Sequence, residues 1–156
     1  MTRKNLMLLA ALGSLALLAG AFAFQHIGGL PPCKMCIWQR WPHAVAIGLG
    51  AATIALGPLL ILALAGALSA LTTAGIGFYH VGVEQKWWEG PKGCTGSGLD
   101  LNQSPQDFLN ALEGVALVRC DEIPWEMLGL SMAGWNALIS LVLAALWISA
   151  ILRTHD

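Results

Sequence analysis

Charged residues are scarce in this sequence. Only 11% of the 156 residues are Asp, Glu, Lys or Arg, and 56% are hydrophobic, whereas an ordinary soluble domain carries about 25% charged residues. The net charge is −1, so the chain lacks the basic excess with which proteins bind nucleic acid. A chain with so little charge to face water is predicted to lie in a lipid bilayer.

Charge is absent altogether from residues 5–33, 41–83 and 127–152. A helix needs about 20 apolar residues to cross a bilayer, so the first and last of these stretches hold one span each. The middle stretch is long enough for two, and the adjacent Gly57 and Pro58 mark the expected turn between them. We therefore predict an all-α membrane protein, a bundle of four transmembrane helices over about 6–24, 37–56, 59–80 and 127–152.

The first span has an alternative interpretation as a cleaved signal peptide. Arg3 and Lys4 precede it, and Ala21-Phe22-Ala23 has the small residues of a cleavage site. Its apolar run is longer than the roughly 7 to 15 residues of a signal core, which favours a retained span. The mass of the mature protein would distinguish the two.

Two loops join the spans on one side, over about 25–36 and 81–126. Eight of the nine acidic residues lie between Glu84 and Glu126, so the second loop is predicted to be solvated. Within it Ser104 and Pro105 are typical of a helix start. The short helix that follows either packs on its own protein or lies in the membrane surface. A second helix start is predicted near Pro124, because proline suits the first turn of a helix.

The four cysteines carry the chemistry. Cys33 and Cys36 have the two-residue spacer of redox-active dithiols, and Ile37 in place of His excludes a c-type haem attachment. They precede the second span, where the helix dipole favours a thiolate, and Arg40 follows Cys36 by one turn. Arg40 either stabilises that thiolate or anchors the helix end at the interface.

Cys94 and Cys120 are too far apart for a local motif, and three interpretations remain open for them. They form a partner-facing redox pair, a structural disulfide, or part of a four-cysteine zinc site. An even number of cysteines at a membrane boundary indicates an oxidising compartment.

Orientation follows from this compartment rather than from the distribution of basic residues. Applied to a bare count of Lys and Arg, the positive-inside rule would put the termini outside, because the cysteine side carries the larger number of basic residues. The cysteine chemistry requires the opposite, so we expect both termini in the cytoplasm and the cysteines on the other side. Five tryptophans are expected to form an aromatic belt on the cysteine side: Trp38, Trp41, Trp87, Trp88 and Trp125.

These residues together resemble the disulfide bond formation protein B family, DsbB, over nearly the whole chain. The resemblance rests on Pro32-Cys33-Lys34-Met35-Cys36 with Arg40, on Cys94 and Cys120 in the second loop, and on the segment 124–130 followed by Trp135. It implies a single domain, 1–156, in the bacterial inner membrane, with periplasmic cysteines.

The resemblance also implies a function. The protein would reoxidise a periplasmic, DsbA-like oxidase of thioredoxin fold and pass the electrons to a membrane quinone, either ubiquinone or menaquinone. Cys94 and Cys120 would face the partner, and Cys33 and Cys36 would face the quinone. Arg40 and His80 would lie near the quinone head group, and no metal is implied.

Two rival functions remain. Vitamin K epoxide reductases also use two cysteine pairs, but their membrane-embedded pair lies on the last helix, and residues 127–152 contain no cysteine. The other rival is a non-catalytic membrane scaffold, either stapled by disulfides or binding zinc.

Overall fold

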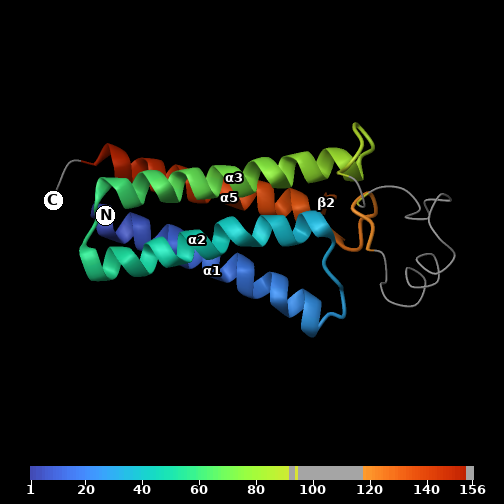
Figure 1. The fold of residues 1–156 in the computed structure, drawn as a ribbon, viewed down its shortest axis with the longest axis horizontal. Coiled ribbons are helices and arrows are strands. Elements are labelled where there is room, and N and C mark those ends of the chain that lie inside the picture. The colour runs from blue at the N-terminus through green and yellow to red at the C-terminus, as the bar shows by residue number, and fades with distance from the viewer. Residues whose placement is uncertain (92–93, 95–117, 154–156) are drawn as a thin grey trace, which may run out of the picture.

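The computed structural model describes residues 1–91, 94 and 118–153, and four long helices dominate this part of the chain. They are α1 (Arg3–His26), α2 (Lys34–Leu56), α3 (Leu60–Glu84) and α5 (Met132–Leu152). The helices lie side by side as a bundle (Figure 1), in which α1 packs on α2, α2 on α3, α3 on α5 and α5 on α1.

The turn between α2 and α3 falls at Gly57-Pro58, where the sequence predicts it. Gly57 ends α2 with a φ of 85°, a left-handed value that glycine adopts without a steric penalty. Leu62 and Ala63 then donate backbone hydrogen bonds to the Leu59 carbonyl as α3 begins. The two helices are therefore antiparallel neighbours.

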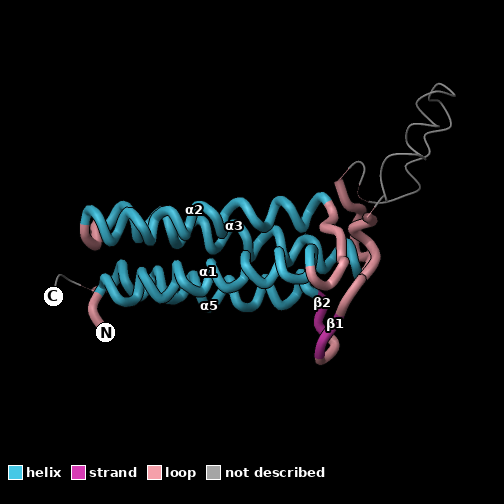
Figure 2. Tube along the Cα trace, turned by 90° about the horizontal axis from the view of Figure 1, so that it is seen from below, coloured by secondary structure: helices cyan, strands magenta, loops and turns pink. Residues whose placement is uncertain are grey.

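A small β-hairpin precedes α5 and departs from the all-α prediction. Strands β1 (Glu126–Met127) and β2 (Leu130–Ser131) pair antiparallel, with Glu126 opposite Ser131 (Figure 2). Leu128 and Gly129 both have positive φ, as the two-residue turn of a tight hairpin requires.

The last helix therefore starts at Met132, later than the predicted start near Pro124. Ser131 caps it by accepting a hydrogen bond from the backbone N–H of Gly134, at 3.2 Å. The helix predicted after Ser104 lies outside the described residues.

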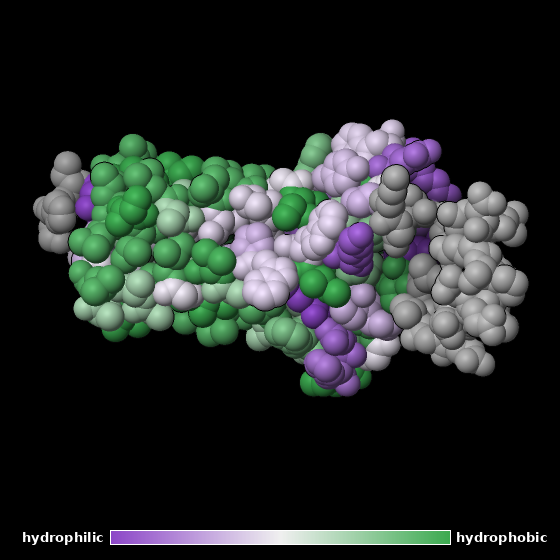
Figure 3. All heavy atoms as spheres, in the orientation of Figure 1, coloured by the Kyte–Doolittle hydropathy of each residue, from purple (hydrophilic) through white to green (hydrophobic). Residues whose placement is uncertain are grey.

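Among the described residues, three helices are long and apolar enough to cross a membrane: α1, α3 and α5. Helix α2 is of similar length, but its first half carries Lys34, Gln39, Arg40 and His43, which lower its mean hydropathy. The protein is thus a helical membrane protein, and the fourth span remains a prediction. On the face that Figure 3 shows, the half of the bundle on the side of the chain termini is mostly hydrophobic, as lipid contact requires.

Small residues let α3 and α5 approach closely. Ala67, Ala70 and Ala74 of α3 are buried, as are Ala137 and Ala144 of α5. Such residues are typical of packed transmembrane helices, where the hydrophobic effect does not drive association.

At the end away from the cysteines, Trp147 of α5 is completely buried. A Cβ added to Gly66 of α3 would lie 2.4 Å from Cδ2 of its ring. Arg3 joins the start of α1 to the end of α5, because its Nε donates to the Ala150 carbonyl at 3.0 Å.

We expect Gly66→Ala to destabilise the bundle by about 1–3 kcal/mol, because the added methyl group overlaps the buried Trp147 ring. The matched control is Gly75→Ala in the same helix, where an added Cβ meets nothing within 4 Å. Thermal unfolding of both variants in detergent measures the difference. Equal melting temperatures for the two would contradict the proposed packing.

Candidate active site

Cys33 and Cys36 meet at the start of α2. Cys33 is the residue that caps the helix, and its Sγ accepts a hydrogen bond from the Cys36 backbone N–H at 3.1 Å. The two sulfur atoms lie 2.7 Å apart as free thiols. Cys33 is buried and Cys36 is half-buried. The cap therefore both begins the helix and brings the dithiol together.

The two thiols differ in electrostatics. The hydrogen bond to the Cys36 sulfur, together with burial, raises the pKa of the Cys33 thiol far above its usual value. This shift favours the form in which Cys33 keeps its hydrogen, with the Cys33 S–H as the donor to the Cys36 sulfur. Cys36 lies in the first turn of α2, where the positive end of the helix dipole favours a thiolate.

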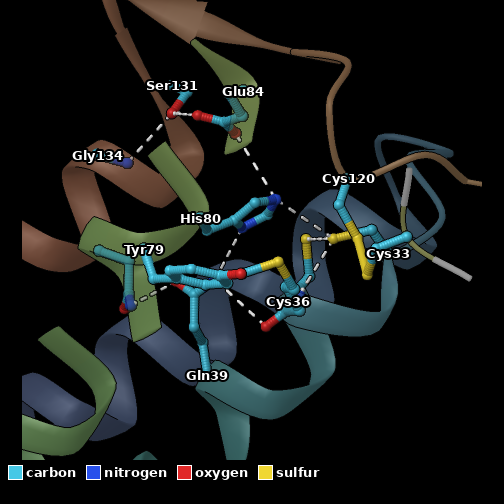
Figure 4. A network of polar contacts seen from close by, with 12 residues as sticks. Cys33, Cys36, Gln39, Tyr79, His80, Glu84, Cys120, Ser131 and Gly134 are labelled. Carbon is cyan, nitrogen blue, oxygen red and sulfur yellow. Dashed lines mark hydrogen bonds and ion pairs between the residues drawn. A yellow bond between two sulfur atoms is a disulfide. The ribbon is translucent and has the colours of Figure 1, made fainter. Parts of the chain in front are cut away.

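The second cysteine pair packs directly on the first. Cys94 and Cys120 form a disulfide, and the Cys120 backbone N–H donates to the Cys94 carbonyl at 2.8 Å. Cys33, Cys94 and Cys120 belong to one buried cluster with Met35 and Val83, and Figure 4 shows Cys120 beside Cys33. Because Cys94 and Cys120 are bonded to each other, this state has no site with four thiolate ligands.

A cavity of about 440 Å³ lies against the dithiol. Its walls come from the second half of α1, the first half of α2, the starts of α5 and its hairpin, and the end of α3. Helix α1 diverges from α2 towards this end (Figure 1). The walls are mostly apolar and include Leu17, Leu18, Phe24, Trp125, Trp135 and Ile139.

Arg40 lines the same cavity, but its hydrogen bonds reach α1 rather than Cys36. Its guanidinium donates to Gln25 Oε1 at 2.6 Å and to the Ala21 carbonyl at 3.3 Å. It also lies over the Phe22 ring, 4.9 Å from the centroid. Arg40 thus links α2 to α1 by hydrogen bonds beside the dithiol, and it places a positive charge in the wall of the cavity.

His80 reaches Cys33 from α3. It is buried, and its Nε2 lies 3.6 Å from Cys33 Sγ and 3.9 Å from Glu84 Oε1. Glu84 is also buried and accepts a hydrogen bond from the Ser131 hydroxyl (Figure 4).

Several polar residues of this site were not predicted from the sequence: Gln39, His43, Glu84, Ser131 and Asn136. Polar side chains within the predicted spans are the signal that could have found four of them, because such residues are costly in a membrane and are usually functional. Glu84 falls in the predicted loop, whereas the structure buries it at the end of α3.

Known proteins match this chain over most of its length. The family model of disulfide bond formation protein DsbB matches residues 3–150. The chain is 34% identical to disulfide bond formation protein B of Verminephrobacter eiseniae, over 93% of the chain and 86% of that protein. It is 38% identical to the Methylococcus capsulatus protein of the same name, over 91% of the chain and 90% of that protein. The chain belongs to the DsbB family. No solved structure matches it significantly.

In the described part of the chain, one group of three side chains is close enough together to bind a metal ion. The sulfur atoms of Cys33 and Cys36 and a ring nitrogen of His80 all lie within 4.8 Å of one another. A metal would need an unprotonated nitrogen on His80 facing the sulfurs. The protonation of that nitrogen therefore decides between a metal site and a hydrogen-bonded dithiol.

The geometry predicts unequal reactivity of the two thiols in this DsbB family chain. Cys36 is half-buried at a helix N-terminus, whereas Cys33 is only 4% exposed and keeps its hydrogen. In the reduced protein, brief exposure to iodoacetamide at neutral pH should label Cys36 before Cys33, as mapped by peptide mass.

The single variants Cys33→Ser and Cys36→Ser serve as controls that identify each labelled peptide. Faster labelling of Cys33 in the unsubstituted protein would contradict the assignment of the thiolate to Cys36.

Proposed function

We propose that this protein is a protein-disulfide:quinone oxidoreductase of the membrane. It reoxidises a periplasmic, DsbA-like dithiol oxidase and passes the electrons to a membrane quinone. The observation that carries the proposal is the contact between the two cysteine pairs, one of which forms a loop disulfide while the other lies beside a mostly apolar cavity. That contact allows thiol exchange between the pairs without a carrier.

The relay is a series of thiolate attacks on disulfide sulfurs. A thiolate of the reduced partner attacks Cys94, which forms a mixed disulfide and releases Cys120. The second partner thiol then displaces Cys94, and the partner leaves oxidised. In the form of the protein in which Cys33 and Cys36 are also joined by a disulfide, Cys120 attacks Cys33, so a Cys120–Cys33 bond forms as the Cys33–Cys36 bond breaks. Alternatively, the Cys94–Cys120 disulfide re-forms at the expense of Cys33–Cys36, which gives the dithiol seen in this structure. Either order leaves Cys36 as the thiolate at the cavity.

The electron balance explains the need for a quinone. The partner gives up two electrons and two protons, and it is a strong oxidant near −120 mV. Transfer to a glutathione pool near −200 mV would be uphill by about 80 mV, or about 4 kcal/mol. A membrane quinone has the higher potential required, and it takes up both electrons and both protons to become a quinol.

The residues that line the cavity fit such a molecule. A quinone head group is flat and mostly apolar with polar oxygens at its edge, and the cavity combines apolar walls with the polar groups of Cys36, Arg40 and His80. Arg40 supplies positive charge and His80 supplies a ring nitrogen near the dithiol. Arg40 would hold the head group beside Cys36, and His80 would lie near it.

We further propose that α2 completes four spans and that the single domain lies in the bacterial inner membrane. The cysteines then face the periplasm and both termini face the cytoplasm. The start of α1 and the end of α5 lie at the end of the bundle opposite to the cysteines, which supports this arrangement (Figure 1).

Cys36→Ser should abolish quinone reduction by the purified protein, because the thiolate at the cavity is lost. The assay mixes the protein with a quinone and a reduced thioredoxin-like dithiol and follows quinone absorbance. Thr53→Val is the matched control, since Thr53 is buried in the same helix and its hydroxyl donates within that helix, to the Leu49 carbonyl.

Normal turnover of the Cys36→Ser variant would refute the proposed mechanism. Absence of turnover in the unsubstituted protein, with metal released on chelation, would favour the scaffold interpretation instead.

Cys120→Ser leaves Cys94 as a free thiol, so the variant is mixed with the oxidised partner: the Cys94 thiolate attacks the partner's disulfide, and one partner sulfur leaves as a thiolate. The mixed disulfide should then persist, because the thiol that would reclaim Cys94 is missing. Mass spectrometry of the trapped complex should show the bond at Cys94. Cys94→Ser is the control and should trap nothing at this position. A partner joined at Cys33 or Cys36 in the Cys120→Ser variant would contradict the assigned order of exchange.

A further inference from the structure

A chain of hydrogen bonds crosses three helices and ends on Cys33. His43 Nε2 bonds to Asn136 Oδ1 at 2.9 Å, and Asn136 Nδ2 bonds to Gln39 Oε1 at 2.7 Å. Gln39 Nε2 bonds to His80 Nδ1 at 3.0 Å, and His80 Nε2 bonds to Cys33 Sγ at 3.6 Å. The chain thus links the middle of α2 to its N-terminal cysteine by way of α5 and α3.

The chain has a direction, because an amide nitrogen can only donate. The Gln39 amide nitrogen faces His80 Nδ1, so Nδ1 must accept, and the hydrogen of the neutral ring lies on Nε2. Nε2 lies 3.6 Å from the Cys33 sulfur and 3.9 Å from Glu84 Oε1, so the sulfur is the nearer acceptor for that hydrogen. Each earlier link donates in the same sense, from His43 to Asn136 and from Asn136 to Gln39.

Neighbouring groups hold both amides in this orientation. Gln39 Nε2 also donates to the Met35 carbonyl at 3.3 Å, and Asn136 Nδ2 also donates to Thr73 Oγ1 at 3.1 Å. The Thr73 hydroxyl in turn donates to the Gln39 carbonyl at 3.1 Å. Reversing either amide would place like groups against each other in a site where Gln39, His43 and His80 are buried.

We propose that Gln39 and Asn136 are positioning residues that hold His80 in the tautomer whose Nε2–H hydrogen-bonds the Cys33 sulfur and stabilises Cys33 as a thiolate. The inference deepens the proposed function, in which Cys33 is released as a thiolate when its bond to Cys120 or Cys36 breaks. His80 keeps its hydrogen throughout, so the device transfers no proton and no electron.

This role complements the high pKa of the Cys33 thiol in the resting dithiol. There Cys33 donates its own hydrogen to the Cys36 sulfur, and His80 Nε2–H is a second contact. When that hydrogen has left, the buried Cys33 sulfur retains two donors, the Cys36 backbone N–H and His80. Hydrogen bonds to a buried anion are stronger than those between neutral groups.

The same tautomer also argues against a metal ion bound by Cys33, Cys36 and His80. The lone pair of His80 lies on Nδ1 and is taken by Gln39, so Nε2 offers a hydrogen rather than a ligand to an ion. The cluster is therefore built to hydrogen-bond a thiolate.

Other titratable groups surround Cys33 and His80, and they are the same in all the variants compared below, with Cys36 replaced by Ser throughout the alkylation series. Helix α2 contributes Cys36, Arg40 and His43, α3 contributes Glu84, and the second loop contributes Arg119 and Glu122. The parts of α1 and α5 that line the cavity contribute none.

The tautomer itself is measured by nitrogen NMR of the purified, quinone-free protein labelled with ¹⁵N-histidine. We expect the His80 signals of a neutral ring protonated at Nε2, with His80→Phe used for assignment. Gln39→Leu and Asn136→Leu should each abolish this preference. Thr53→Val, which removes a buried hydroxyl outside the chain, should preserve it.

The consequence for Cys33 is measured in a Cys36→Ser background, where Cys33 is the one free thiol while the Cys94–Cys120 disulfide is intact. Loss of a donor raises the pH at which the thiolate forms. Adding Gln39→Leu, Asn136→Leu or His80→Phe should therefore slow alkylation of Cys33 at neutral pH by about threefold to tenfold and shift the pH profile upward. Thr53→Val should leave the profile in place.

A His80 ring protonated at Nδ1 in the unsubstituted protein would overturn the inference. A pH profile that shifts with His80→Phe but with neither Gln39→Leu nor Asn136→Leu would also overturn it. Gln39 and Asn136 would then have no influence on the hydrogen bond from His80 to Cys33. A variant that has lost its fold exposes Cys33 and is alkylated faster, which is opposite to the expected change. Neither measurement uses quinone or partner, so the proposed oxidase function stands or fails separately.

Discussion

The hydrogen bond from the Cys36 backbone N–H to the Cys33 sulfur is the interaction on which the site depends. It starts helix α2 at the dithiol, and it holds the two sulfurs 2.7 Å apart. It also makes the thiols unequal, since Cys33 is buried as the cap while Cys36 lies in the first turn. A helix that began a few residues later would leave both cysteines in an unconstrained loop.

The environment of the bundle limits how polar groups can be placed around this cap. Polar side chains within a membrane have no water to bond with, so they must find partners on neighbouring helices. Here they do so in a connected group at the cysteine end, from His43 and Gln39 of α2 to Asn136 of α5 and His80 of α3. The other end is closed by small residues and the buried Trp147 ring.

Much of the architecture was predictable because it rests on local patterns. The charge-free stretches predict where the long helices lie, and Gly57-Pro58 predicts the turn between α2 and α3. The hairpin at 126–131 was missed because Pro124 resembles a helix start, whereas the positive φ of Leu128 and Gly129 and the cap at Ser131 delay the helix to Met132. Helix α2 contains polar residues that lower its mean hydropathy, and for this reason it is less apolar than the three helices around it.

By itself the sequence determined the apolar character of the chain, the spacing of Cys33 and Cys36 and their place before a helix, because these depend on residues a few positions apart. Only the tertiary structure decided which groups meet the dithiol. His80 is 47 residues from Cys33, and Asn136 is 97 residues from Gln39. Their contacts arise from the packing of α2, α3 and α5, and the direction of each hydrogen bond depends on side-chain amides whose orientation no sequence pattern specifies.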